Sequence, residues 1–252
     1  MNEQNAMKPY VIGLDLGGTN SVFGIVDARG EIKATTAIKT KAYDNEEDYV
    51  NASIDALHII IDQVGGIEKI KAMGIGAPNG NFYTGSIDFA ANLPWARDRS
   101  VPLAKMFSER LGGIPVGLTN DANAAAIGEM IYGVARGMKN FIMITLGTGV
   151  GSGIICNGQM VYGSDGLAGE LGHVIVRPEN GRPCGCGRRG CLETYCSATG
   201  VARTRVPGEE RHAVAVARHE SRGHHIARCV DRRPEGRQAG PGDLRVHWRI
   251  AG

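Results

Sequence analysis

"YVIGLDLGGTNSVFGIVDARG", residues 10–30, and "NFIMITLGTGVGSGIICNGQMVYG", residues 140–163, repeat one pattern at two places in the chain. In each, a continuous apolar run typical of a buried strand enters a glycine turn that contains threonine, and a second strand follows. Two hairpins bent around similar turns predict two related domains that hold phosphates between them. Because strands and helices alternate up to about residue 204, the fold class is α/β.

The segments between and after these repeats predict the rest of the domain organisation. We expect a hairpin at 21–40, strands at 70–78 and 114–121, and helices at 45–66, 101–113 and 122–133. The first of these helices has one apolar face, made by Val50, Ile54, Leu57, Ile61 and Val64. We divide the chain into an N-terminal α/β domain (1–119), the start of a C-terminal α/β domain (120–204) and an arginine- and histidine-rich tail (205–252).

Composition limits the location and the partners of the protein. The 252 residues are 42% hydrophobic, which is enough for one large domain or two small ones. No apolar run approaches the length of a membrane span, and "MNEQNAMKPY" at the start lacks the layout of a secretory signal. We therefore expect a cytoplasmic protein without a membrane partner, in which the six cysteines stay reduced.

The two glycine turns, "DLGGTN" (15–20) and "LGTGVGSG" (146–153), are candidate phosphate loops. Glycine allows the backbone to approach an anion and to adopt positive φ, so that successive N–H groups point at phosphate oxygens. Thr19 and Thr148 add hydroxyl donors, and Asp15 is placed to hold a phosphate-bound Mg²⁺ through water. The alternative is that both are ordinary hairpin turns in which glycine serves geometry alone.

Asn120 and Asp121 lie where a predicted strand ends and a helix begins, the place where open α/β sheets bind ligands. Both residue types are also preferred helix N-caps, and only one cap is needed. A carboxylate here would accept the proton of a substrate hydroxyl as its oxygen attacks phosphorus. Spacing alone leaves the capping and the catalytic interpretations equal.

"PCGCGRRGC", residues 183–191, supplies three cysteines at short spacing. With His173 they match the four ligands of a structural zinc site: Cys184, Cys186 and Cys191 complete the set. Arg188 and Arg189 would favour the thiolate forms. The alternative is three incidental cysteines on a flexible loop, whereas Cys156 and Cys196 are expected in the core.

A zinc ion would lock the loop that connects "GELGH" (169–173) to "GCLET" (190–194). Glu170, His173 and Glu193 would then lie on one rigid frame. Two carboxylates and an imidazole in fixed positions suit the hydroxyl groups of a sugar. If His173 binds the metal through one ring nitrogen, its other N–H remains available to the ligand.

Together "GLDLGGTN", "GIGAPN", "NLPW", "NDANAAA", "LGTGVGSGI", "GELGH" and "CGCGRRGCLE" resemble the ROK family, most closely its bacterial glucokinases, over about residues 8–204. The resemblance implies an actin-like, ribonuclease-H-like pair of α/β domains and phosphorylation of the 6-hydroxyl of a hexose by MgATP. Glucose is the first candidate; N-acetylmannosamine, N-acetylglucosamine and fructose are alternatives. The family also suggests a homodimer.

The resemblance assigns roles residue by residue. Asp121 corresponds to the catalytic base. The implied sugar ligands are Asn92, Asn120, Glu170, His173 and Glu193. The implied phosphate loops comprise Asp15, Gly17, Gly18 and Thr19 in the first and Thr148 and Gly149 in the second. The implied zinc ligands are His173, Cys184, Cys186 and Cys191.

The family pattern stops near Thr204, so the C-terminal domain is expected to be incomplete. Residues 201–252 contain eleven arginines, six acidic residues and no lysine. We interpret this as a shift of reading frame near residue 204: "GDLRVHWRIA" can be encoded so that the DNA, read one base along, gives "EIFEFTGELL", an acidic amphipathic helix. An incomplete domain would leave apolar surface exposed.

Three other functions were weighed. A basic arm that binds nucleic acid lacks lysine, aromatic residues and a recognisable fold, so no nucleic-acid partner is expected. A repressor of the same family needs a helix-turn-helix before the first phosphate strand, and only nine residues precede Tyr10. Hexose binding without catalysis remains open.

Overall fold

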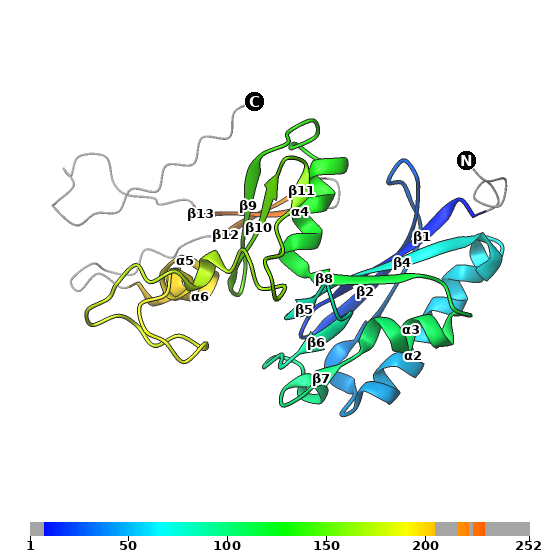
Figure 1. Cartoon of the computed structure of the whole chain (residues 1–252), viewed down its shortest axis with the longest axis horizontal. Coiled ribbons are helices and arrows are strands. Elements are labelled where there is room, and N and C mark those ends of the chain that lie inside the picture. Colours follow the sequence, from blue (N-terminus) through cyan, green and yellow to red (C-terminus); the bar gives the residue numbers. More distant parts are fainter. Residues whose placement is uncertain (1–7, 205–215, 222–223, 230–252) are drawn as a thin grey trace.

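The computed structural model describes residues 8–204, 216–221 and 224–229, and its elements form two groups (Figure 1). The first lobe, residues 8–120, contains a five-stranded sheet and two long helices. The second lobe, residues 121–204, contains a three-stranded sheet, one long helix and the cysteine-rich loop. Of the predicted tail only a hairpin of β12 (Val216–Ser221) and β13 (His224–Cys229) is described; the rest, and with it the frame-shift interpretation, lies outside the described residues.

The sheet of the first lobe has the strand order β3-β2-β1-β4-β8. β1 pairs antiparallel with β2 and parallel with β4, and β8 extends the parallel part. Since parallel strands end at the same edge, the turn after β1 and the residues after β8 lie together there. The predicted strands are confirmed. Their bounds are β1 Tyr10–Leu16, β2 Asn20–Asp27, β3 Ile32–Lys39, β4 Ile70–Ala77 and β8 Val116–Asn120.

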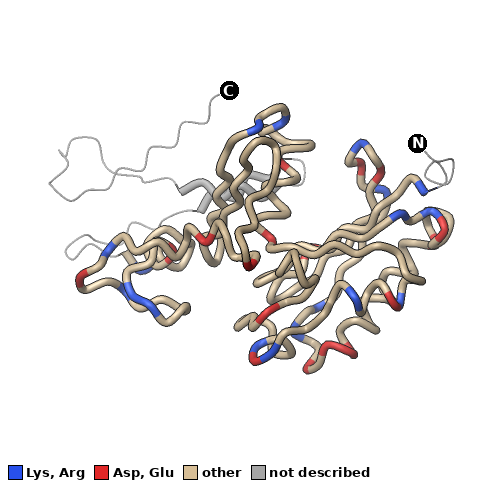
Figure 2. Tube along the Cα trace, viewed as in Figure 1, with Lys and Arg blue, Asp and Glu red and all other residues tan. Residues whose placement is uncertain are grey.

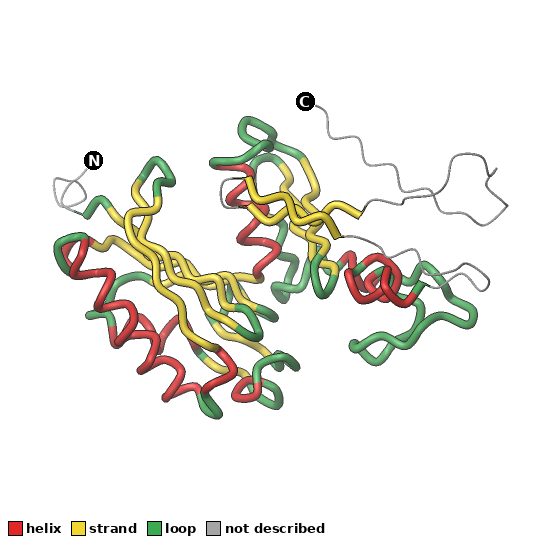
Figure 3. The backbone as a smooth tube through the Cα atoms, turned by 180° about the vertical axis from the view of Figure 1, so that it is seen from behind, coloured by secondary structure: helices red, strands yellow, loops and turns green. Residues whose placement is uncertain are grey.

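Helices α2 (Glu46–Gln63) and α3 (Leu103–Arg110) cover one face of this sheet (Figures 1 and 3). The side chain of Asn45 caps α2 by accepting the Asp48 N–H at 2.8 Å. The predicted apolar face of α2 is buried against the sheet. Each such Leu or Ile contributes about 1.5–3 kcal/mol by leaving water, so this interface is the core of the first lobe.

A small sheet that the sequence did not predict inserts between β4 and α3. It consists of β5 (Gly80–Asn81), β6 (Ser86–Asp88) and β7 (Ser100–Val101). Strands of two or three residues are too short to show periodicity. Four single-turn 3₁₀ helices complete the connections: Thr40–Ala42, Ile67–Lys69, Pro94–Ala96 and Leu171–His173.

Helix α4 (Asp121–Ile131) joins the two lobes, because it contacts β4 and β8 on one side and the sheet of the second lobe on the other. A Cβ at Gly153 would lie 2.6 Å from the Cβ of Ala126, so α4 packs directly on the glycine-rich strand. The domain boundary at 119/120 stays a prediction. The remaining bounds are β9 Phe141–Leu146, β10 Val150–Cys156, β11 Gln159–Met160, α5 Glu193–Cys196 and α6 Ala198–Arg203.

One face of the edge strand β9 is open. Ile142, Ile144 and Leu146 are 56%, 43% and 44% exposed. This agrees with the expectation that apolar surface is exposed in an incomplete second domain. Among the described residues, no helix has both the length and the hydropathy to cross a bilayer.

Candidate active site

The two glycine turns occupy the expected positions, between β1 and β2 and between β9 and β10. Their glycines do not adopt the positive φ that we predicted. They lie close to side chains instead: a Cβ at Gly18 would lie 3.1 Å from the amide nitrogen of Asn92, and one at Gly149 would lie 2.5 Å from Oε2 of Glu193. Thr19 and Thr148 are exposed at these turns. Each turn therefore packs against a predicted sugar-binding residue.

Asn120 and Asp121 lie together at the start of α4, where both side chains accept the same backbone N–H. The side chain of Asn120 accepts the Ala122 N–H at 2.9 Å and so caps α4. One oxygen of Asp121 also accepts this N–H, at 2.8 Å, and its other oxygen has no partner within the described residues. Asp121 is exposed at the edge where β1, β4 and β8 end. A carboxylate at this position has one oxygen available to accept a proton.

Asp15 lies at the same edge, close enough to Asp121 for the charge of Asp121 to affect the pKa of Asp15. Desolvation by the surrounding chain, and then the charge of Asp121, raise the pKa of Asp15, although its side chain is still open to solvent. Two ionised carboxylates at one edge repel each other, and a divalent cation held next to Asp15 would offset that repulsion.

Glu170 brings the second lobe into this group. Burial raises the pKa of Glu170, His173 lowers it, and the charges of Asp121 and Glu193 raise it further. These four side chains are therefore electrostatic neighbours although they come from segments far apart in the sequence. Figure 2 shows acidic positions on the side of the second lobe that faces the first. Three of the residues expected to bind a sugar, Glu170, His173 and Glu193, thus lie near Asp121.

Glu193 has a second role that the sequence did not reveal. Its Oε2 accepts the backbone N–H of Val150 at 3.0 Å, directly after the second glycine turn. Glu193 opens α5, which follows the cysteine-rich loop. The carboxylate thus ties that loop to the phosphate turn and keeps one oxygen for a ligand.

The four predicted zinc ligands form one cluster. The ligand atoms of His173, Cys184, Cys186 and Cys191 all lie within 4.8 Å of one another. Sγ of Cys184 lies 3.6 Å from Nδ1 of His173, and Sγ of Cys186 lies 3.7 Å from Sγ of Cys191. Zinc bonds of about 2.3 Å to sulfur and about 2.0–2.1 Å to nitrogen give tetrahedral edges of about 3.7–3.8 Å and about 3.5–3.6 Å. The donor set fits a zinc ion, and Nε2 of His173 stays free.

The thiols are free, and their environments differ. The backbone N–H of Arg188, and then its guanidinium, hold the pKa of Cys186 at about 6, whereas burial raises the pKa of Cys191 to about 11. Arg188 therefore acts as predicted. Arg189 does not: its Nε donates to the carbonyl of Gly181. Of the two cysteines expected in the core, Cys196 is half-buried but Cys156 is exposed at the end of β10, so that prediction was wrong.

Two supporting residues escaped the sequence reasoning. The Ser152 hydroxyl is buried, donates to the carbonyl of Gly169 and accepts the Leu171 N–H, which holds Glu170 on β10. The guanidinium of Arg182 donates to the carbonyls of Thr194, Gly200 and Arg203 and stacks over the Tyr195 ring. The sequence signal for the role of Arg182 was its position two residues before Cys184, the first cysteine of the cluster.

Replacing Asp15 by Asn should stabilise the ligand-free protein at neutral pH. A pKa raised above its unfolded value of 3.8 means that folding favours the neutral carboxyl, and this stabilisation is lost as pH rises through the folded pKa. We expect Tm at pH 7 to rise by about 1–2 °C, since screening keeps the gain small, and the difference to vanish near pH 3. Asp55→Asn on the exposed face of α2 is the matched control; a lower Tm for Asp15→Asn at pH 7 contradicts this account.

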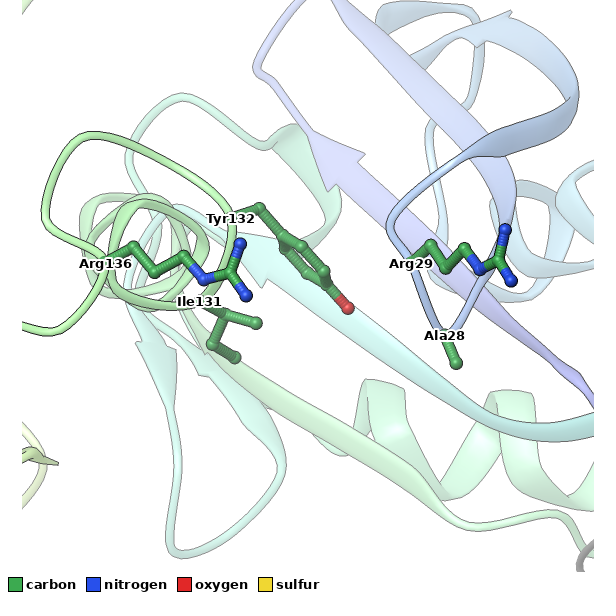
Figure 4. A pocket seen from close by; sticks show the side chains of 5 residues that line it. All are labelled: Ala28, Arg29, Ile131, Tyr132 and Arg136. Carbon is green, nitrogen blue, oxygen red and sulfur yellow. The ribbon is translucent and has the colours of Figure 1, made fainter.

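A separate pocket of about 410 Å³ lies at the other end of α4 (Figure 4). Ala28 and Arg29 of the β2–β3 turn line it together with Ile131, Tyr132 and Arg136. Tyr132 also packs on Gly30, where a Cβ would lie 3.0 Å from the ring. The lobes thus touch here too, but none of the predicted site residues lines this pocket.

The chain is similar to known proteins over most of its length. The chain is 41% identical over 208 residues to a glucokinase of Halalkalibacterium halodurans, an overlap of 81% of this chain and 61% of that protein. It is 31% identical to the xylose repressor of Bacillus subtilis over 79% of this chain and 51% of the repressor. The crystal structure of a ROK family glucokinase from Streptomyces griseus in complex with glucose and AMPPNP matches with a TM-score of 0.63 and 38% identity, over 77% of this chain and 59% of that one.

The chain spans about 60% of the length of the curated glucokinases that it matches. The two lobes have the actin-like ATPase fold of ROK sugar kinases, as expected. The model of the ROK family matches residues 11–231, which extends past the limit near Thr204 that the motifs indicated. The chain belongs to the ROK family.

Proposed function

We propose that the protein is an ATP-dependent hexose kinase with glucose as its preferred acceptor. The observation that carries this proposal lies at the start of α4: Asn120 and one oxygen of Asp121 accept the Ala122 N–H, and the other oxygen of Asp121 has no partner within the described residues. The similarity to bacterial glucokinases supports the choice of hexose. Asn92, Asn120, Glu170, His173 and Glu193 are the proposed sugar ligands.

In the proposed reaction Asp121 accepts the proton of the sugar 6-hydroxyl while its oxygen attacks the γ-phosphorus of ATP. The bond from this phosphorus to the bridging oxygen breaks, and ADP leaves. Backbone N–H groups at Gly17–Thr19 and at Thr148–Gly149 bind the phosphates. Asp15 would hold Mg²⁺, which would neutralise charge on the phosphates.

We infer that His173, Cys184, Cys186 and Cys191 hold a structural zinc ion, because their spacing fits its tetrahedron. A closed site of this kind supplies no reactive position and contributes to folding. For the sugar site, the zinc ion would act by fixing the positions of neighbouring side chains. His173 is fixed by its Nδ1 and offers Nε2 to the ligand, and Glu193, two residues after Cys191, is held at the second phosphate turn.

Release of ADP upon addition of a sugar tests the proposed reaction. With MgATP, the purified protein should release ADP fastest with glucose and more slowly with N-acetylmannosamine, N-acetylglucosamine and fructose. The same panel measured by calorimetry reports binding without turnover. Absence of sugar-dependent ADP release with all four sugars contradicts the kinase proposal.

The similarity to a xylose repressor favours one second candidate, a protein that binds a sugar without transferring phosphate. Sugar binding by calorimetry with no ADP release would support it over the kinase. A homodimer and a cytoplasmic location remain proposals; light scattering of the purified protein measures the first.

A further inference from the structure

The loop after β11, residues 162–168, is a small closed ring between the lobes. The N–H of Ala168 donates to the carbonyl of Tyr162 at 3.0 Å and closes it. Gly163 and Gly166 adopt φ values of +75° and +85° inside the ring, conformations that favour glycine. The loop leads directly to Glu170 and His173, so its position determines where the sugar-binding segment begins.

This loop of the second lobe is bound to the β5–β6 hairpin of the first lobe by an aromatic clasp, which we define as Phe82, Tyr83 and Tyr162. The rings of Phe82 and Tyr162 stack with their centroids 4.1 Å apart and their planes 7° apart. The Tyr83 hydroxyl donates to the carbonyl of Gly163 at 2.6 Å. Figure 1 shows the hairpin on the side of the first lobe that faces the second.

Asn81 connects the clasp to the rigid part of the first lobe. Its amide donates to Asp88 at 3.0 Å and reaches the carbonyl of Asp165 at 3.4 Å. The carboxylate of Asp88 also accepts the hydroxyls of Ser86 and Ser100, which are in β6 and β7. The small sheet is thus a platform that holds the loop of the opposite lobe.

The clasp also reaches the proposed catalytic strand. Oγ1 of Thr119 is buried and has no well-formed hydrogen bond within the described residues. Burial raises the pKa of Tyr162, and the neighbouring Thr119 side chain lowers it in part. Thr119 directly precedes Asn120 and Asp121, so Tyr162 lies near the start of the helix that carries Asp121.

After residue 168, where the closed loop ends, the chain is anchored to the second lobe rather than the first. Ser152 of β10 holds the carbonyl of Gly169 and the N–H of Leu171 on either side of Glu170. Gly169 itself adopts a φ of +92°. Residues 162–168 are therefore held by the first lobe and residues 169–171 by the second. Gly169 lies where the attachment passes from one lobe to the other.

We propose that Phe82 and Tyr162 are positioning residues that hold Glu170 and His173 at the right distance from Asp121 for a hexose to bridge the two lobes. This inference rests on the proposed hexose-binding function. Loss of either ring removes the stack and leaves the loop attached to the first lobe only by the hydrogen bonds of Tyr83 and Asn81. The loop is then less well ordered, and the sugar must order it on binding. The cost falls on sugar binding and not on ATP, whose phosphate turns lie outside the clasp.

The test compares Phe82→Ala, Tyr162→Ala and their combination with the wild-type protein. Hydrogen exchange of the backbone over 162–173 should become faster in each variant without sugar. Glucose Kd and KM should rise about two- to tenfold, the loss of one aromatic pair, with kcat changed less than about twofold and the ATP KM unchanged. The double variant should resemble each single one, because either removes the stack.

Tyr132→Ala is the matched control, since it removes another exposed aromatic contact between the lobes, at the far end of α4. It should leave glucose affinity and exchange over 162–173 unchanged. Unchanged exchange in the clasp variants, unchanged glucose affinity, or an equal effect of Tyr132→Ala overturns the inference. If the wild-type protein binds no hexose, the proposed function fails and the positioning role with it, while the exchange data still report whether the clasp holds the loop.

Discussion

Replacement of Asp121 by Asn should lower kcat for hexose phosphorylation by about 10²–10⁴-fold, the range that general bases contribute. Asn keeps the size of the side chain and an oxygen that can accept the Ala122 N–H, so the start of α4 is preserved. It cannot take the proton of the attacking hydroxyl. Binding of glucose and ATP depends on other groups, so both KM values should change little. The coupled ADP-release assay measures each constant.

The control for this substitution is Asp55→Asn, which removes the same charge from the exposed face of α2. It should leave all kinetic constants unchanged. A kcat for Asp121→Asn within tenfold of the wild-type value, with the protein folded, would remove Asp121 from the catalytic role. Asp15 would then be the remaining carboxylate at this edge of the sheet to examine.

Replacement of Cys191 by Ser should abolish zinc binding and weaken the sugar site. Cys191 is fully buried and lies two residues before Glu193. Its loss therefore disturbs the cysteine-rich loop at a buried ligand. Loss of an outer partner of a metal site already costs about 10–100-fold in metal affinity, and loss of a ligand should cost more. We expect glucose affinity to fall by about tenfold or more, because His173 and Glu193 lose their fixed positions. Elemental analysis and calorimetry measure the two effects.

Cys156→Ser provides the matched comparison, since Cys156 is an exposed thiol outside the cluster. Zinc content and glucose affinity should both be retained. Zinc content equal to wild type in Cys191→Ser would show that this thiol is not a ligand.

The sequence predicted the strands and the long helix of the first lobe well because their signals are local. The apolar runs of β1 and β4 and the apolar face of α2 each depend on neighbouring residues. The grouping of the four proposed zinc ligands was predicted for a similar reason. Cys184, Cys186 and Cys191 are close in the chain, and only His173 had to be brought in from a distance.

Other features depend on contacts between distant segments, which periodicity does not report. The small sheet β5–β6–β7 is too short to show a pattern, and its role becomes visible only through Tyr162 of the other lobe. The glycines of "GVGSG" were expected either to bind phosphate or to shape a hairpin turn, yet Gly153 also allows α4 to pack on β10. The bond from Val150 to Glu193 likewise joins residues that only the fold brings together.

The central claim is that a metal held by one imidazole and three thiolates fixes the wall of the sugar site opposite Asp121. Zinc content and glucose affinity of the same sample, before and after treatment with a strong chelator, test it most directly. We predict about one zinc ion per chain and a clear loss of glucose affinity when the ion is removed. Folded protein that carries no zinc and binds glucose undiminished would contradict the claim.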